Sequence, residues 1–153
     1  MLSVSPAMKD VAQRLLAHET DGRSDIDALA VAIERIHLLL RDRLGGLIGQ
    51  AGFAALFSRA LHLARRENPI LIGISLDTQS RSGLQGTREF AMANAGDPGT
   101  AALALAKILE HVIWLLITFI GEELSMRLIA DIWPELAHLE MASAGGDGEM
   151  TDE

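Results

Sequence analysis

Two Glu-x-x-His pairs are the residues of this sequence whose types and spacing come closest to known chemistry. They are Glu34 with His37 and Glu135 with His138. In a four-helix bundle, a di-iron centre takes two such pairs and one further glutamate from each of two other helices. The glutamates available to complete such a set are Glu19 and either Glu110 or Glu123.

The expected positions of these residues argue against a metal centre. Glu34 falls at the margin of an apolar helical stripe while His37 falls at its middle, and Glu135 follows a proline near the end of the predicted fold. Matches of four common residue types also arise easily by chance. A di-iron-like enzyme is therefore the alternative hypothesis, and its ligands would be Glu34, His37, Glu110, Glu135 and His138.

His37 is informative by itself. It lies between Ile33 and Leu40 in a regular apolar seam, where a histidine must find a hydrogen bond or give up its charge. We interpret it as a buried polar residue, either satisfied inside the core or facing a partner subunit.

Glu123 and Arg127 are spaced as a helical ion pair, but they continue the apolar stripe of Leu116 and Ile120. Two interpretations stay open. The helix changes direction at Gly121 and the pair is solvated, or the pair is partly buried and sets the register of an interface.

Thr118, Gly121 and Ser125 place small side chains on one flank of the same predicted helix. Small residues let a second helix approach closely. Together with Glu123 and Arg127, they are the candidate interface residues.

Nothing else in the sequence indicates catalysis. The chain has no cysteine, which excludes disulfides, thiolate zinc sites and cysteine nucleophiles. The glycines at 45–52 lack the spacing and the lysine of a phosphate-binding loop. We therefore expect no cofactor and no enzymatic activity.

The composition predicts an all-α fold. Hydrophobic residues make up 49% of the 153 residues and aromatic residues only 4%, which favours packed helices over a sandwich or barrel. We predict one domain over 1–140, a bundle of four to six helices, followed by a disordered acidic tail over 141–153. No internal repeat is evident.

The expected helices cover residues 6–20, a segment capped by Ser24, 50–67, 87–94 and a long element from Thr100 to Trp133 that begins at Asp97 and Pro98. Residues 70–76 alternate like a strand, with a hairpin partner near 86–92 or in another subunit. An irregular segment or short helix after Pro69 is the preferred alternative.

Net charge and the N-terminal residues indicate which partners and which cellular compartment to expect. The formal charge of −8 comes from residues 101–153, which carry two basic and ten acidic side chains; this argues against nucleic-acid binding. The N-terminus does not read as a signal peptide, so we expect a cytoplasmic protein. The uncharged run from Val112 to Gly121 is too short for a membrane span.

The sequence resembles small uncharacterised bacterial helical proteins over about a third of its length. The resembling positions are Ile48, Gly49, Gly52, Phe53, Leu56, Phe57, Arg59, His62, Leu63, Ala64 and Pro69, and then Phe119, Ile120, Gly121, Glu122, Leu124, Arg127, Leu128, Trp133 and Pro134. The resemblance implies bacterial origin and carries no activity.

The sequence thus predicts a non-catalytic interaction or regulatory module. Its expected partner is a second copy or another protein, bound through the 103–133 helix, and any small-molecule ligand is unspecified.

Overall fold

The computed structural model describes residues 6–23, 25–77, 79 and 83–136, and in them the chain is an all-α bundle, as predicted. The elements are α1 (Pro6–Glu19), α2 (Ile26–Ile48), α3 (Gln50–Glu67), the 3-10 helix η1 (Pro69–Leu71), β1 (Ser75–Leu76), β2 (Leu84–Gln85), α4 (Thr87–Ala93), α5 (Pro98–Ile120) and α6 (Glu122–Ile132). The predicted acidic tail lies outside the described residues.

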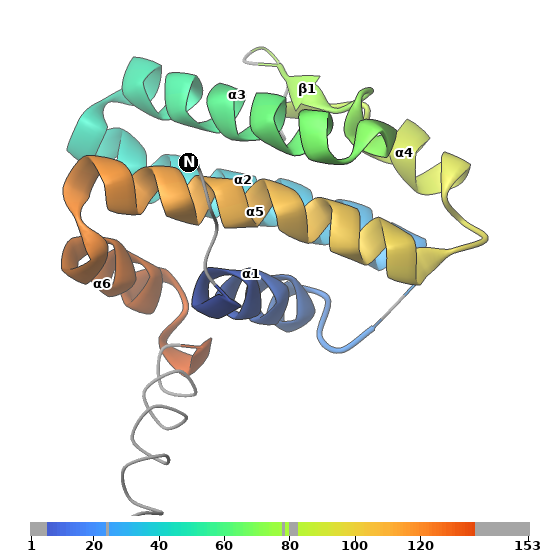
Figure 1. Cartoon of the computed structure of the whole chain (residues 1–153), viewed down its shortest axis with the longest axis horizontal. Coiled ribbons are helices and arrows are strands. Elements are labelled where there is room, and N and C mark those ends of the chain that lie inside the picture. The colour runs from blue at the N-terminus through green and yellow to red at the C-terminus, as the bar shows by residue number, and fades with distance from the viewer. Residues whose placement is uncertain (1–5, 24, 78, 80–82, 137–153) are drawn as a thin grey trace, which may run out of the picture.

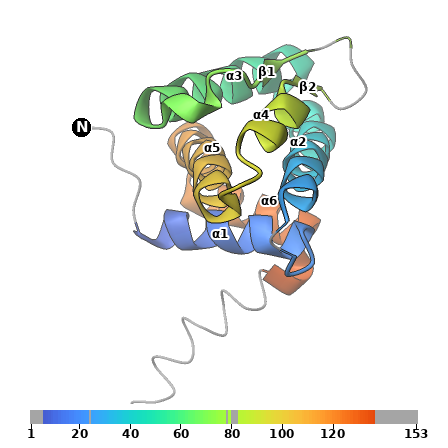
Figure 2. The same cartoon turned by 90° about the vertical axis from the view of Figure 1, so that its right-hand side faces the viewer.

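Helix α5 lies at the centre of the bundle. It passes between α1 and α3, with α2 beside it and α6 packed against its end (Figures 1 and 2). Helical periodicity places Leu105, Leu109, Val112, Ile113, Leu116 and Ile120 on one stripe of α5, and all of them are buried except Ile120, which is half-buried. Burial extends beyond that stripe because four helices contact α5, and it takes in two polar residues described below.

Both long helices begin at an aspartate cap. Asp25 Oδ2 accepts a hydrogen bond from the Ala28 N–H at 3.2 Å, and Asp97 Oδ1 accepts one from the Thr100 N–H at 3.2 Å. Ser24, the cap predicted from the sequence, lies outside the described residues. Asp25 is the cap because α2 begins at Ile26, so that Asp25 is the residue directly before the first turn.

Both long helices also end at a glycine that the next helix follows at once. Gly49 has φ 85° and ψ 158°, and Gly121 has φ 90° and ψ 160°, a region that is essentially restricted to glycine. Of the two interpretations left open at Gly121, the structure has the change of direction: Gly121 divides the 103–133 segment into α5 and α6. Gly45 and Gly46, by contrast, lie inside α2.

The two glycines belong to a structural pattern that both halves of the chain share, although no repeat is evident in the sequence. Asp25 and Asp97, and likewise Gly49 and Gly121, are separated by the same 72 residues, and each pair encloses a helix of 23 residues. Every buried position of α2 is also buried at the same offset in α5. The pairs are Leu29 and Ala101, Ala32 and Ala104, Ile33 and Leu105, Ile36 and Ile108, His37 and Leu109, Leu40 and Val112, and Leu44 and Leu116.

The correspondence continues in part beyond the two glycines, although Leu56 and Ala60 of α3 are buried while their counterparts Leu128 and Ile132 are half-buried. Phe53, Phe57, Leu61 and Ala64 are buried, and so are their counterparts Ser125, Ile129, Trp133 and Leu136. The packing is also reciprocal: α1 packs on α5 and α4 on α2, while α3 also contacts α5 and α6 also contacts α2. Each of the two three-helix units, α1–α3 and α4–α6, thus packs its first helix on the long helix of the other, although α1 also packs on α2 whereas α4 makes little contact with α5.

The segment near 70–92 combines both interpretations of the sequence. Residues 69–71 form the 3-10 helix η1, which matches the preferred short helix after Pro69. A small antiparallel hairpin then pairs Ser75 with Gln85 and Leu76 with Leu84. The strand pairing is within the chain, and it occupies two residues on each side rather than the whole of 70–76.

The Asp97 cap gives a pH-dependent prediction. Two hydrogen bonds from Thr100 lower the pKa of Asp97 below its ordinary value of 3.8; the bond from the hydroxyl has the larger effect and the bond from the amide the smaller. Deprotonation thus favours the folded state; this contribution is complete above the ordinary pKa and is lost as pH falls through the folded one. We expect Thr100→Ala to raise the Asp97 pKa toward its ordinary value, measured by carboxyl NMR titration. Thr118→Ala, at an exposed helical threonine, should leave it unchanged.

Candidate functional site

His37 occupies an aromatic pocket in the core. The residue is 2% exposed, and its ring lies 4.6 Å from Phe57 in an edge-on arrangement and 5.4 Å from Phe53. Gly83 covers the other side, because a Cβ at Gly83 would overlap the imidazole. The surroundings are those of a packed core side chain beneath a close backbone turn.

Glu34 is directed elsewhere. Its carboxylate accepts a short hydrogen bond from the Thr87 hydroxyl and so ties α2 to the start of α4. The Glu34 and His37 side chains of the first Glu-x-x-His pair therefore have different neighbours.

The other proposed metal ligands are also separated. Glu135 is an exposed side chain whose Oε1 lies 3.5 Å from His18 Nε2, Glu110 is buried on α5, and His138 lies outside the described residues. Within the described part of the chain, no three His, Asp or Glu side chains are grouped so that they would hold a metal ion.

Glu19, a further metal-ligand candidate, serves as a structural anchor. Its side chain is 8% exposed, its Oε1 lies 2.9 Å from Arg35 Nε, and its Oε2 accepts a hydrogen bond of 2.7 Å from the Trp133 indole N–H. One carboxylate thus connects the end of α1, the middle of α2 and the residue that ends α6.

Helix α5 carries a buried polar cluster that was not predicted from the sequence. Glu110 Oε1 lies 3.5 Å from Lys107 Nζ, and His111 Nε2 lies 3.1 Å from Glu67 Oε2. Glu110 and His111 are 3% and 4% exposed, and neither of these two atoms makes a hydrogen bond of good geometry within the described structure. The available signal was the Glu-His pair inside an otherwise apolar run.

The candidate interface residues do not form one open flank. Thr118 and Gly121 are exposed, and the Thr118 hydroxyl donates to the Trp114 carbonyl at 2.9 Å. Ser125 is fully buried. The Glu123 and Arg127 side chains are 91% and 66% exposed and lie 3.5 Å apart, which matches the solvated interpretation.

Large apolar side chains are exposed around the glycine turn between α5 and α6. Phe119 is 69% exposed and Leu124 is 37% exposed. A surface hollow of about 400 Å³ lies beside them, lined by Ile120, Gly121, Glu122, Glu123, Leu124 and Arg127. This corner, residues 118–127, contains all five residues that the sequence singled out for an interface, of which Ser125 is buried.

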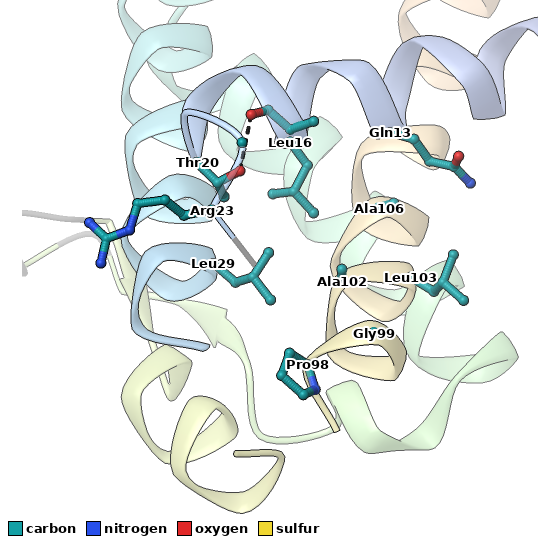
Figure 3. A pocket seen from close by; sticks show the side chains of 12 residues that line it. Gln13, Leu16, Thr20, Arg23, Leu29, Pro98, Gly99, Ala102, Leu103 and Ala106 are labelled. Atoms are coloured by element: carbon teal, nitrogen blue, oxygen red, sulfur yellow. Dashed lines mark hydrogen bonds between the residues drawn. The ribbon is translucent and has the colours of Figure 1, made fainter. Parts of the chain in front are cut away.

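A second hollow, of about 360 Å³, lies between α1 and the first half of α5 (Figure 3). Leu16, Leu29, Ala102 and Ala106 give it an apolar floor. The Arg23 guanidinium points away from it and pairs with Asp25 at 3.1 Å (Figure 3). The groove therefore offers contact area without a converging charged group to orient a ligand.

Comparison with family models, characterised proteins and solved structures gives no match to this chain. Function is therefore argued from the geometry alone. Within the described residues, α5 is long and apolar enough to cross a membrane by length and composition, and 61% of its most apolar window is buried. Core helices of soluble bundles share these properties.

Replacing Trp133 tests the Glu19 anchor. Trp133→Phe keeps an aromatic ring but removes the indole donor, so we expect a loss of about 1.5–3 kcal/mol in the free energy of unfolding, as for hydrogen bonds to charged groups. Urea denaturation monitored by circular dichroism measures it. Trp114→Phe, at the half-buried second tryptophan, should cost clearly less, and equal losses would contradict a specific anchor.

Replacing Gly83 tests the cover over His37. Gly83 has φ 78°, and an added Cβ meets the imidazole, so Gly83→Ala should destabilise the fold by about 1 kcal/mol or more. Gly46→Ala is the control, because nothing lies near its added methyl group and helical alanine is favoured by about 0.5–1 kcal/mol. A neutral Gly83→Ala would show that the turn does not rest on the ring.

Proposed function

We propose that this protein is a non-catalytic interaction module that acts as a homodimer through the α5–α6 corner. The observation that carries the proposal is the exposure of Phe119 and Leu124 beside the turn at Gly121. Exposed apolar side chains that gather at one place mark contact surfaces more often than isolated ones do.

The position of α5 in the bundle limits which part of residues 103–133 a partner can contact. The middle of α5 is enclosed by other helices and has no free face for a partner. The exposed residues of α5 lie toward its two ends, near Leu103 and near Phe119, and the interface candidates lie at the second of these, beside the outer side of α6. Of the five interface candidates, the four exposed ones, Thr118, Gly121, Glu123 and Arg127, lie in this corner.

Charge supports self-association at the corner. Glu122 and Glu123 are acidic and Arg127 is basic, and all three are exposed. A two-fold interface brings the same patch of both subunits together, so the patch must carry groups of both signs or none. Exposed ion pairs add little affinity. In this proposal the apolar side chains therefore supply the affinity of the dimer, and the charged side chains fix the relative orientation of the two subunits.

The setting proposed for this module is the bacterial cytoplasm, as the sequence alone suggested. A metal-dependent activity has no geometric support among the described residues, since Glu34, Glu110 and Glu135 each have separate neighbours. Stoichiometric iron or manganese in protein purified without a histidine tag would contradict the proposal.

The test is the solution mass across a dilution series, by light scattering. We expect a dimer that dissociates on dilution, and we expect Phe119→Ser with Leu124→Ser to weaken it by at least about a hundredfold. The estimate follows from about 1.5–3 kcal/mol per buried large apolar side chain.

Met92→Ser is the matched control for that variant. Met92 is 72% exposed but belongs to α4, at the opposite end of the bundle (Figure 1). Its replacement should leave the dissociation constant unchanged. A wild-type chain that stays monomeric at the highest soluble concentration would overturn the proposal.

A further inference from the structure

We infer that the self-association surface has two equivalent parts, one from each half of the chain, and that the end of α2 in one copy docks on the end of α5 in the other. The inference rests on the proposed homodimer and specifies how its surface is built. It adds Leu47 and Arg43 of α2 to a corner so far described from α5 and α6 alone.

The first support is the repeated exposure of an apolar residue. Leu47 and Phe119 stand two positions before Gly49 and Gly121, and they are 50% and 69% exposed. Because the two glycines have nearly the same φ and ψ, the two side chains leave their helices in equivalent ways. Both halves thus keep a large apolar residue at a position that the fold leaves in water.

The second support is the location of the two turns. Helices α2 and α5 both end at the left of Figure 1, where α3 and α6 begin. Leu47 and Phe119 therefore belong to the same end of the bundle (Figure 1). Two equivalent apolar positions on one end form a surface that a single partner can cover.

The third support is a difference in charge between the two parts. Arg43 precedes Leu47 by one helical turn on the same face and is exposed, whereas its counterpart on α5 is the buried Leu115. Glu122 and Glu123 follow Gly121, where Gln50 and Ala51 follow Gly49. The α2 part of the end is therefore basic and the α5 part is acidic.

Among the charged residues near this end, Arg43 and Glu122 are the two that we expect to form ion pairs with a second copy. Asp42 lies beside Arg43 in sequence but about 100° away around the helix, and Glu123 is already paired with Arg127. Within the described part of the chain, neither Arg43 nor Glu122 has a salt bridge.

A second copy of this chain fits such a surface. A two-fold contact is self-complementary when each feature of the patch meets its complement in the other subunit. If the second copy is turned face to face about an axis lying in the end surface, Leu47 meets Phe119 and Arg43 meets Glu122, and each contact occurs twice. A partner of unrelated sequence would not require basic and acidic parts in this balance.

Charge reversal and mixing test the arrangement on the full chain. Arg43→Glu alone places an acidic group opposite Glu122 at each of the two equivalent contacts, and Glu122→Arg alone places a basic group opposite Arg43 at each of them. Like charges brought together at an interface are strongly unfavourable, so each variant should raise the dimer dissociation constant by at least about tenfold, measured by sedimentation velocity. Arg66→Glu, an exposed reversal at the far end of α3, should not change it.

An equimolar mixture of the two variants decides the inference. In the mixed dimer, residue 43 of each subunit again faces a residue 122 of opposite charge, so native mass spectrometry should show a heterodimer in excess of both homodimers. Because neither variant can regain affinity this way if it is misfolded, restoration also excludes a folding defect.

The outcomes separate this inference from the function on which it rests. A wild-type dimer that neither variant weakens, or variants whose mixture restores nothing, would overturn the docking of α2 on α5 while leaving the homodimer in place. A wild-type monomer at every concentration would overturn both.

Discussion

The structure depends on the removal of one apolar helix from water. Helix α5 carries its apolar side chains around most of its circumference, and a single neighbouring helix would cover only one stripe of them. Four helices approach it instead: α1, α2, α3 and α6. Each fully buried large side chain contributes about 1.5–3 kcal/mol, so the arrangement of the other helices follows from this requirement. As a consequence, α5 has little exposed surface, and its exposed residues lie toward its two ends. The contacts proposed with a second copy are therefore placed at an end of the helix.

The shared pattern shows how such a bundle is built from two similar units. Each unit has an aspartate cap, a helix of 23 residues and a glycine turn, and each places its short first helix on the long helix of the other. The two halves differ in polarity at some matching positions. The positions of Leu38 and Leu39, half-buried in the first unit, are taken by Glu110 and His111 in the second, where Glu67 and Lys107 accompany them. The charge of the two glycine ends differs in the same way, basic at the first and acidic at the second.

For the buried polar residues, the sequence predicts at most burial, and not the partners of the side chains. His37 stands in an apolar seam, and its periodicity predicts a buried position; the aromatic pocket around it comes from α3 and could not be read from its own helix. Glu19 has no such pattern, because the groups it binds, Arg35 and Trp133, come from distant parts of the chain. The Glu-x-x-His spacing is real, but Glu34 turns to Thr87, a residue whose proximity depends on how α4 packs on α2.

The sequence alone determined the class of fold and most helix limits. Caps, glycines and apolar periodicity are local properties, and they placed α1, α3 and α4 to within a residue or so at each end. The break at Gly121 was one of two options, because glycine permits both a helical and an extended conformation. Tertiary structure decided the rest: which carboxylates are anchors, which apolar residues remain in water, and that the two halves repeat one another. The repeat is carried by burial and backbone geometry rather than by residue identity, so it becomes visible only when the helices are packed.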